Sequence, residues 1–381
     1  MLKKQNLFKR AYVGFCGPGK HQLLRVSLFC LLLSLLGGAI LLLLLGKDPL
    51  VAYRSLLQGS GILPKAKYPG KKSQLTDFLT LLNYTVPMIF ASLSVAVALK
   101  CGLFNICVSG IMVLSGFIAT VLVGYSDITS IVAKILVILI GIGVGALMGA
   151  LIGFLKYKFN MNEVVVAIMF NYIISYVASF FIQTKFVDPV TRQSVEINEN
   201  ARLTLVDVEM FNLRMNITTV FILALIFVFV IKFMLDKTKF GFELKSVGAN
   251  QKASRYCGIK VGSTIIKTMI ISGSLAGLAG VTYYLGAYAS IQPRVVPSLG
   301  FDAIAVALLG NMTPIGCFLA SILVMIFETG TAYLSSRIGV LREIAALITS
   351  ILLLFSASSG YFRLIANRYK LELLDNGGKN E

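Results

Sequence analysis

Histidine and tryptophan are almost missing from this sequence, which has one histidine, His21, and no tryptophan. A single histidine is too little for a cluster of metal-ligating side chains or for a histidine-dependent catalytic triad. The six cysteines show no CxxC spacing, and they lie in apolar stretches or in loops expected to be cytoplasmic. We therefore expect free thiols, no metal site, and neither a redox enzyme nor a hydrolase.

Charged residues are also scarce, at 14% of the chain, whereas 57% of the residues are hydrophobic and the mean hydropathy is +0.83. This composition is typical of an integral membrane protein. The net charge of +18 comes from lysines and arginines in polar stretches beside apolar segments. We expect these side chains to contact the anionic headgroups of membrane lipids, and we expect no nucleic-acid partner.

The apolar residues gather in about ten segments, each expected to be a membrane-spanning helix, so the predicted fold is all-α. The first segment is too long for the core of a signal peptide and is expected to remain as a helix. The segment that begins at Gly300 is about half as long as a straight crossing requires, which predicts a half-helix or part of a discontinuous span. The approximate ranges are 23–45, 77–99, 101–125, 129–155, 163–183, 217–235, 264–289, 300–309, 314–334 and 339–357.

Basic residues are more frequent in the stretches that this order of helices places inside the cell, and both ends of the chain are then cytoplasmic. The first outer loop is expected to be irregular because it contains Pro49, Pro64 and several glycines. The predicted division is a cytoplasmic N-terminus at 1–22, a transmembrane permease domain at 23–357 with outer loops at 46–76 and 185–215 and a cytoplasmic segment at 236–263, and a cytoplasmic tail at 358–381.

Glycines recur at every fourth position of one apolar segment, at Gly141, Gly145, Gly149 and Gly153. This spacing places them on one stripe of a helix, where another helix can approach closely. The stripe predicts either a static close contact or a surface on which two helices slide.

A polar stretch from Gly241 to Gly262, GFELKSVGANQKASRYCGIKVG, interrupts the apolar segments. If Asn250 caps a helix that Gly258 ends, Ala253 lies one turn before Tyr256 and Cys257 on one face, with Lys252, Ser254 and Arg255 turned away. Such a helix can seat in a cleft of a soluble partner that moves the transmembrane part. A solvated loop is the other interpretation.

Few acidic residues lie within the apolar segments, where each charge costs about 3 kcal/mol. Glu163 is expected at a helix N-terminus, and Asp302 is expected either to cap a helix or to line a cavity. Glu328 and Glu343 are expected to form structural ion pairs with Arg337 or Arg342 rather than a proton relay. Because the segments contain no ladder of charges, we expect the energy for any transport to come from another subunit.

Neutral polar and aromatic side chains are better represented within the segments. Amides can bond hydroxyl groups and aromatic rings can stack on a sugar or a base, so these side chains suit an uncharged polar solute. Many such side chains instead hold neighbouring helices together. The candidates for a solute path are Phe104, Asn105, Ser109, Asn171, Tyr172, Phe301 and Asp302.

Five stretches between about Thr76 and Tyr361 carry a family resemblance: GLFNICVSG, NEVVVAIMFNYI, GFELKSVGANQKASRYCGI, SGSLAGLAG and GFDAIAVALLGNMTPIG. In this order the chain resembles the permease subunits of bacterial ABC importers. The similar branch includes ribose, branched-chain amino acid and nucleoside permeases, and the nucleoside type that works with a basic-membrane-protein lipoprotein is the most similar. Ser109 and Ile111 stand where the family often has an acidic residue and a glutamine.

The resemblance implies that the polar stretch contains the coupling helix on which an ABC ATPase docks. It implies that this separate subunit binds ATP and Mg, that this chain holds no cofactor, and that a second permease subunit completes a dimer, expected to be a heterodimer. It also implies a bacterial cytoplasmic membrane location. The expected coupling residues are Gly241, Glu243, Gly248, Asn250, Ala253, Arg255, Tyr256 and Gly258.

The resulting hypothesis is a permease, not an enzyme, that moves nucleosides by alternating access. The same machinery could carry a simple sugar such as ribose, a riboflavin-like compound or a branched-chain amino acid. A secondary transporter or channel without an ATPase is another alternative, which the scarcity of charges within the segments disfavours. A membrane-embedded enzyme is disfavoured by the single histidine and the lack of paired acids in one segment.

Overall fold

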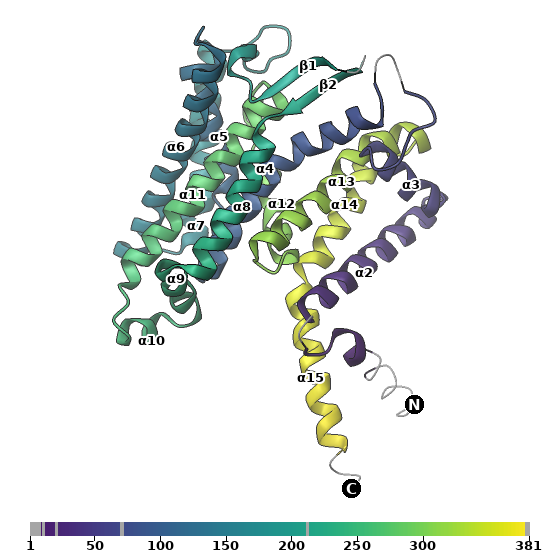
Figure 1. Ribbon diagram of the computed structural model, residues 1–381, viewed down its shortest axis with the longest axis vertical. Helices are drawn as coiled ribbons and strands as arrows, with labels where there is room; N and C mark the ends of the chain where they lie inside the picture. The colour runs from purple at the N-terminus through teal and green to yellow at the C-terminus, as the bar shows by residue number, and fades with distance from the viewer. Residues whose placement is uncertain (1–8, 10–11, 20–21, 69–71, 211–212, 378–381) are drawn as a thin grey trace.

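The computed structural model describes the chain except for residues 1–8, 10–11, 20–21, 69–71, 211–212 and 378–381. The described part is mostly helical, as predicted, and contains one two-stranded hairpin (Figure 1). The elements are α2 (Gln22–Leu44), α3 (Pro49–Gly59), α4 (Gln74–Lys100), α5 (Val108–Ala119), η1 (Thr120–Gly124), α6 (Ser130–Phe159), α7 (Glu163–Lys185), η2 (Glu199–Ala201), β1 (Thr204–Met210), β2 (Leu213–Thr218), α8 (Val220–Lys237), α9 (Lys239–Ala249), α10 (Gln251–Tyr256), α11 (Val261–Thr282), η3 (Tyr283–Tyr288), α12 (Leu299–Leu309), α13 (Pro314–Ile338), α14 (Arg342–Ala357) and α15 (Ser359–Gly377).

Each predicted apolar segment is a helix, but the helices differ in length. Within the described residues, six are long and apolar enough to cross a membrane, namely α2, α4, α6, α7, α11 with η3, and α13. The pair α14 and α15, bent by 43°, makes seven if it counts as one span. The apolar helices α5 with η1 and α12 are shorter. A multi-pass membrane protein is thus confirmed, and ten complete crossings stay a prediction.

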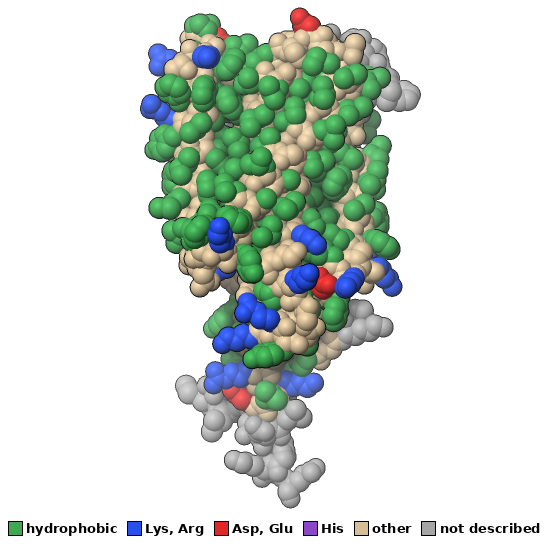
Figure 2. Space-filling model, turned by 90° about the vertical axis from the view of Figure 1, so that its left-hand side faces the viewer, with side chains coloured by type: hydrophobic (Ala, Val, Ile, Leu, Met, Phe, Trp, Pro, Cys, Tyr) green, Lys and Arg blue, Asp and Glu red, His purple; other side chains and the backbone are tan. Residues whose placement is uncertain are grey.

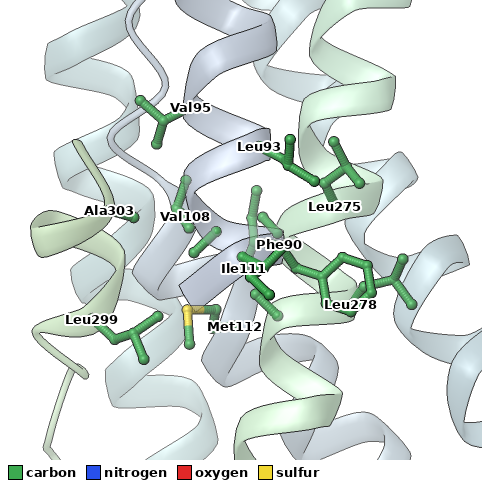
Figure 3. Packing of buried hydrophobic residues seen from close by; sticks show 14 of the residues in the cluster. Phe90, Leu93, Val95, Val108, Ile111, Met112, Leu275, Leu278, Leu299 and Ala303 are labelled. Carbon is green, nitrogen blue, oxygen red and sulfur yellow. The ribbon is translucent and has the colours of Figure 1, made fainter. Parts of the chain in front are cut away.

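Helix α4 forms the centre of the fold. Its residues from Thr85 to Ala98 are buried on every side, which is expected of a helix that is apolar all round. It contacts α5, α11, α12 and α13, and Figure 3 shows Phe90 and Leu93 of α4 in one cluster with side chains of α5, α11 and α12. The core therefore lies between helices that are far apart in the sequence.

The predicted glycine stripe of α6 packs against α11. A Cβ added at Gly145 would collide with the backbone carbonyl of Gly273, and one added at Gly149 would collide with that of Met269. In return, Gly277 of α11 faces the carbonyl of Gly141. Backbone lies against backbone along this contact, which supports the static interpretation of the stripe.

The first predicted outer loop is not wholly irregular, because residues Pro49–Gly59 form α3. Asp48 caps this helix by accepting a hydrogen bond from the Leu50 amide at 2.8 Å, and Pro49 takes the first helical position, where its missing N–H costs nothing. Gly59 lets α3 approach Gly330 of α13. The proline that indicated a loop therefore starts a packed helix.

The second predicted outer loop contains a β-hairpin. Strands β1 and β2 are antiparallel, with Thr204 opposite Thr218 and an irregularity between Leu205 and Val208. The Thr204 hydroxyl lies 2.9 Å from Asn83 Oδ1, which anchors the hairpin on α4. An all-α prediction missed this small sheet, although the alternating pattern of residues 204–210 is typical of a strand.

The helix axes define two ends of the molecule. The start of α2, the helix α15 and the helices α9 and α10 lie towards one end in Figure 1, whereas α3 and the hairpin lie towards the other. On the face in Figure 2, hydrophobic side chains form a broad band, and lysines and arginines gather below it at the end of α10. This pattern matches a membrane-embedded body with a basic rim.

Candidate functional site

The stretch between α4 and α5 holds the first predicted path residue, Asn105. Its side chain is 1% exposed. Its Nδ2 donates to Ser272 Oγ of α11 at 2.8 Å, and its Oδ1 accepts from the Cys107 amide at 3.1 Å. Ser272 in turn donates to the backbone carbonyl of Ser94 at 2.9 Å. Asn105 therefore joins α4, α5 and α11, and its polar atoms are occupied by protein groups.

Asn171 of α7 performs a similar task at the start of α5. Its Oδ1 accepts from the Gly110 amide at 2.8 Å, and its Nδ2 donates to the Ile106 carbonyl at 3.1 Å. The amides of a first helical turn have no partner within their own helix, so this side chain satisfies one of them in an apolar setting. Gly110 has no side chain, which leaves room for Asn171 to approach.

Ser109 connects α5 to the stretch before α12. Its hydroxyl donates to the Pro297 carbonyl at 2.9 Å, and a Cβ on Gly300 would collide with the Ser109 side chain. The N-terminal turns of α5 and α12 therefore meet. Asn105 and Asn171 thus hold the start of α5 against α11 and α7, and Ser109 ties it to the stretch before α12.

The other predicted path residues lie outside the hydrogen bonds described above. Phe301 and Asp302 lie in the first turn of α12, where Phe301 is 43% exposed and Asp302 is partly exposed. Tyr172 is 59% exposed on the surface of α7, and Phe104 is partly buried in the stretch before α5. The structure thus separates the set into buried residues at a helix junction and residues with exposed surface.

A cluster of tyrosines between α4 and η3 was not among the predicted path residues. The rings of Tyr84 and Tyr288 lie 5.5 Å apart, and those of Tyr283 and Tyr288 lie 4.5 Å apart. Glu328 of α13 lies near enough to Tyr283 and to Asp302 of α12 for their negative charges to repel one another. We call Tyr84, Tyr283, Tyr288, Asp302 and Glu328 the acid–tyrosine cluster. Tyr84 and Tyr283 belong to the neutral polar and aromatic side chains of the apolar segments that suit an uncharged polar solute, whereas the sequence assigns Glu328 to an ion pair.

The predicted pairing of Glu328 with Arg337 is wrong, because Arg337 donates a hydrogen bond to Gln58 of α3 instead. The side chain of Arg342, the other expected partner, lies outside the described residues. Within the described part of the chain, Glu328 forms no ion pair.

The predicted coupling stretch forms two short helices. In α9, Gly241, Leu244 and Val247 are buried on one face. A Cβ on Gly241 would collide with the Met234 carbonyl, and one on Gly248 with the Lys100 carbonyl. These two glycines therefore seat α9 against the ends of α8 and α4. Glu243 is partly exposed and lies 3.9 Å from Lys239.

The predicted cap of α10 is confirmed. Asn250 Oδ1 accepts from the amides of Lys252 at 3.0 Å and Ala253 at 3.1 Å, and Gly258 follows the helix with a φ of +80°. Ser254 is buried against the protein, whereas Tyr256 is 94% exposed.

The exposed side chains of α10 include small, basic and aromatic ones. Among the residues exposed together are Lys252, Ala253, Arg255 and Tyr256. The basic side chains therefore share the exposed surface with Ala253, although we expected them on a different face. At the start of α7, Glu163 occupies the predicted N-terminal position and pairs with Lys156 at 2.6 Å. No group of three or more histidine, cysteine, aspartate or glutamate residues could hold a metal ion among the described residues.

Comparison with known proteins covers most of the chain. Residues 78–357 match the family described as branched-chain amino acid transport system / permease component. The nucleoside ABC transporter permease protein NupB of Lactococcus lactis is 33% identical over 87% of this chain and 90% of its own length. The guanosine ABC transporter permease protein NupP of Bacillus subtilis is 33% identical over 91% of this chain and 97% of its own length.

A second permease of Lactococcus lactis, the nucleoside ABC transporter permease protein NupC, is 26% identical over 69% of this chain and 84% of its own length. No solved structure is significantly similar to the chain. The match over residues 78–357 includes the junction of α5 and α12, the acid–tyrosine cluster and the two helices α9 and α10. The chain belongs to the branched-chain amino acid transport system / permease component family, and it is a membrane permease of an ABC transporter, not an enzyme.

Proposed function

We propose that this permease imports nucleosides into a bacterial cell by alternating access, driven by ATP hydrolysis on a separate subunit. The observation that carries the proposal is the 33% identity to two permeases named for nucleoside or guanosine transport, over nearly their whole length. Similarity over the full length includes the elements that line a path as well as those that form the scaffold.

The acid–tyrosine cluster supports a nucleoside as the cargo. The face of a tyrosine ring can stack on a base, an interaction worth about 1–3 kcal/mol per base. The carboxylates of Asp302 and Glu328 can accept hydrogen bonds from ribose hydroxyls or from base N–H groups. With Phe301 on the same helix turn as Asp302, these side chains offer both kinds of contact.

The buried amides have a different role in this proposal. Asn105 and Asn171 already bond protein groups at the start of α5. They fix the start of α5, and Ser109 joins that start to the stretch before α12, which carries Phe301 and Asp302. The solute path therefore runs beside the junction and along the acid–tyrosine cluster.

The helices α9 and α10 are the proposed contact for an ABC ATPase, which would bind ATP and Mg. The exposed face of α10 carries Ala253 and Tyr256. The small side chain of Ala253 would allow this face to pack closely into a cleft of a partner. Gly241 and Gly248 pack α9 directly on α8 and α4. A displacement of α10 would thus be transmitted to α4, the central helix.

We further propose ten crossings with both ends cytoplasmic, counting α5 with η1, α8 and α12 as short or broken spans. This topology places α10 and the start of α2 on the same side, in agreement with Figure 1. A substrate-binding lipoprotein would deliver the solute at the end with α3 and the hairpin. A second permease would complete a heterodimer in the cytoplasmic membrane, a proposal supported by the two nucleoside permeases of Lactococcus lactis.

Reconstitution tests the proposal. The complex of this chain with its ATPase, binding protein and sister permease is placed in proteoliposomes, and uptake of guanosine and ATP hydrolysis are measured together. Guanosine should stimulate both. Ala253→Arg should remove the stimulation because the arginine blocks the small position of α10, whereas Ala253→Ser, which keeps a small side chain at the same exposed position, should not.

The outcomes separate the parts of the proposal. Uptake that persists without the ATPase would overturn the importer. Stimulation by ribose but not by guanosine would leave the importer intact and overturn the cargo. If Ala253→Arg matches the wild-type rate, α10 is not the coupling contact.

A further inference from the structure

An apolar cleft of about 400 Å³ lies between α2 and the turn that connects α12 to α13. Leu28 and Leu31 of α2 line one side, and Leu319 and Leu323 of α13 line the other. Leu28 is 47% exposed and Leu319 is 59% exposed, so the cleft opens to the surroundings of the protein. In a membrane, hydrocarbon chains are the only abundant material that can fill such a space.

A second recess, of about 290 Å³, adjoins the cleft. The two share Thr313 and Ile315 of the α12–α13 connection. The recess is lined by three lysines and one aspartate, namely Lys100, Lys232, Lys245 and Asp236. An apolar cleft thus continues directly into a basic recess.

The charges of this recess do not cancel. Lys245 lies 3.5 Å from Asp236, which accounts for one lysine. Lys100 and Lys232 form no ion pair within the described part of the chain. Lysines at the C-terminal ends of helices also interact favourably with the helix dipole. That role does not explain why the lysines share one recess beside an apolar cleft. The recess therefore carries excess positive charge, which attracts anions.

The position of the recess agrees with the depth of lipid headgroups. Lys100 is the last residue of α4, and Lys232 follows the uninterrupted apolar run of α8 from Val220 to Ile231. Both lysines therefore lie where apolar helix surface ends, which is where a membrane interface is expected. Anionic lipids attract basic side chains there.

We propose that the cleft and the recess together bind one anionic phospholipid. An acyl chain would lie between α2 and α13, and the phosphate would lie between Lys100 and Lys232. Because Lys245 belongs to α9, the bound headgroup would contact the helix that seats α10. The proposal depends on the membrane location of the chain and is independent of the transported solute.

Lipid binding by the purified transporter complex tests the headgroup contact. The complex is placed in vesicles of equimolar phosphatidylcholine and phosphatidylglycerol, and the lipids that remain bound after mild extraction are identified by mass spectrometry. The double variant Lys100→Gln, Lys232→Gln should lower the preference for phosphatidylglycerol about five-fold per lysine, since each basic residue near the surface contributes about 1 kcal/mol.

The matched control is Lys239→Gln with Lys252→Gln, two exposed lysines outside the recess and on the same two helices as the coupling stretch. Equal losses of phosphatidylglycerol in both double variants would overturn the proposal, because the attraction would then be a general surface effect. Unchanged retention in the Lys100 and Lys232 variant would overturn it as well.

Filling the cleft tests the acyl-chain contact. Leu319→Trp should reduce the amount of lipid that remains bound, whichever headgroup it carries, because the larger ring occupies the cleft. Leu139→Trp on α6, at a leucine with 58% exposure, should leave it unchanged. Bound phosphatidylglycerol equal to that of the wild type in Leu319→Trp, with the protein folded by circular dichroism, would contradict a lipid in this cleft.

Discussion

Two helix contacts in this permease use the same residue type in different ways. Gly145 of α6 faces the backbone of α11, whereas Gly37 of α2 faces the side chains of Ile351 and Phe355 in α14. The first contact joins two main chains, so neither side can adjust unless a whole helix moves. The second joins a main chain to side chains, which can change rotamer.

The surroundings of the two contacts differ as well. α6 and α11 pack backbone against backbone along their glycines, while α2 borders the apolar cleft described above. On that side, Asn311 of the α12–α13 connection donates a hydrogen bond of 3.0 Å to Ser27 of α2. Close-packed elements move as one body, and loosely packed ones can shift relative to each other. We therefore infer that α4, α6 and α11 form a rigid unit and that α2 is a more movable neighbour.

The largest effect is expected from Gly145→Ala. The added methyl group collides with the Gly273 carbonyl, so α6 and α11 must separate along a glycine-lined contact. We expect a loss of about 3 kcal/mol in the free energy of unfolding. Unfolding in mixed micelles with increasing dodecyl sulfate measures it.

The control for that variant lies on the same helix. Gly143 has nothing within 4 Å of an added Cβ, so Gly143→Ala changes helix propensity without a collision. A loss in Gly143→Ala as large as that in Gly145→Ala would mean that the helix itself is affected rather than its contact with α11.

A second variant asks whether α7 belongs to the rigid unit. Asn171→Ala removes the acceptor of the buried Gly110 amide, and an unsatisfied buried donor costs about 2 kcal/mol. The neighbouring Tyr172→Ala, at an exposed position of the same helix, should change the free energy of unfolding by less than about 0.5 kcal/mol. Equal effects would show that the hydrogen bond does not hold α7 to α5.

Local signals explain what the sequence could predict. Long apolar segments predicted the helices, and the pair Asn250 and Gly258 predicted the limits of α10, because caps act within one helical turn. The four-residue glycine spacing predicted a close contact on α6 for the same reason. Each of these inferences needs only neighbours along the chain.

Long-range partners explain what the sequence could not predict. Asn171 was selected as a solute contact, but its partners, Gly110 and Ile106, come from another helix and could not be read from the residue itself. Pro49 indicated a loop, but a proline also favours the first position of a helix. Only the packing of α3 on α13 decides between the two. The acid–tyrosine cluster depends on the packing of α4, η3, α12 and α13.

A smaller effect is expected at α10, whose attachment is local. Asn250→Ala removes the cap that receives the amides of Lys252 and Ala253 and should destabilise this helix by about 1 kcal/mol. Hydrogen exchange at those two amides should become faster, while exchange in α9, seated by Gly241 and Gly248, should not change. Asn250→Asp, which retains the acceptor, should restore slow exchange. Faster exchange throughout α9 would show that α9 and α10 open together.

The smallest effect is expected from Gly37→Ala, which makes the same substitution as Gly145→Ala on the looser side of the molecule. The new Cβ would lie 3.1 Å from Ile351 Cγ2, a side-chain atom at an interface that can adjust. Alanine also favours the helix over glycine by up to about 1 kcal/mol, which opposes the crowding. The free energy of unfolding should therefore change by no more than about 0.5 kcal/mol in the titration used for α6. A loss equal to that of Gly145→Ala would show that α2 is held as rigidly as α6, and the contrast between the two sides of the permease would be wrong.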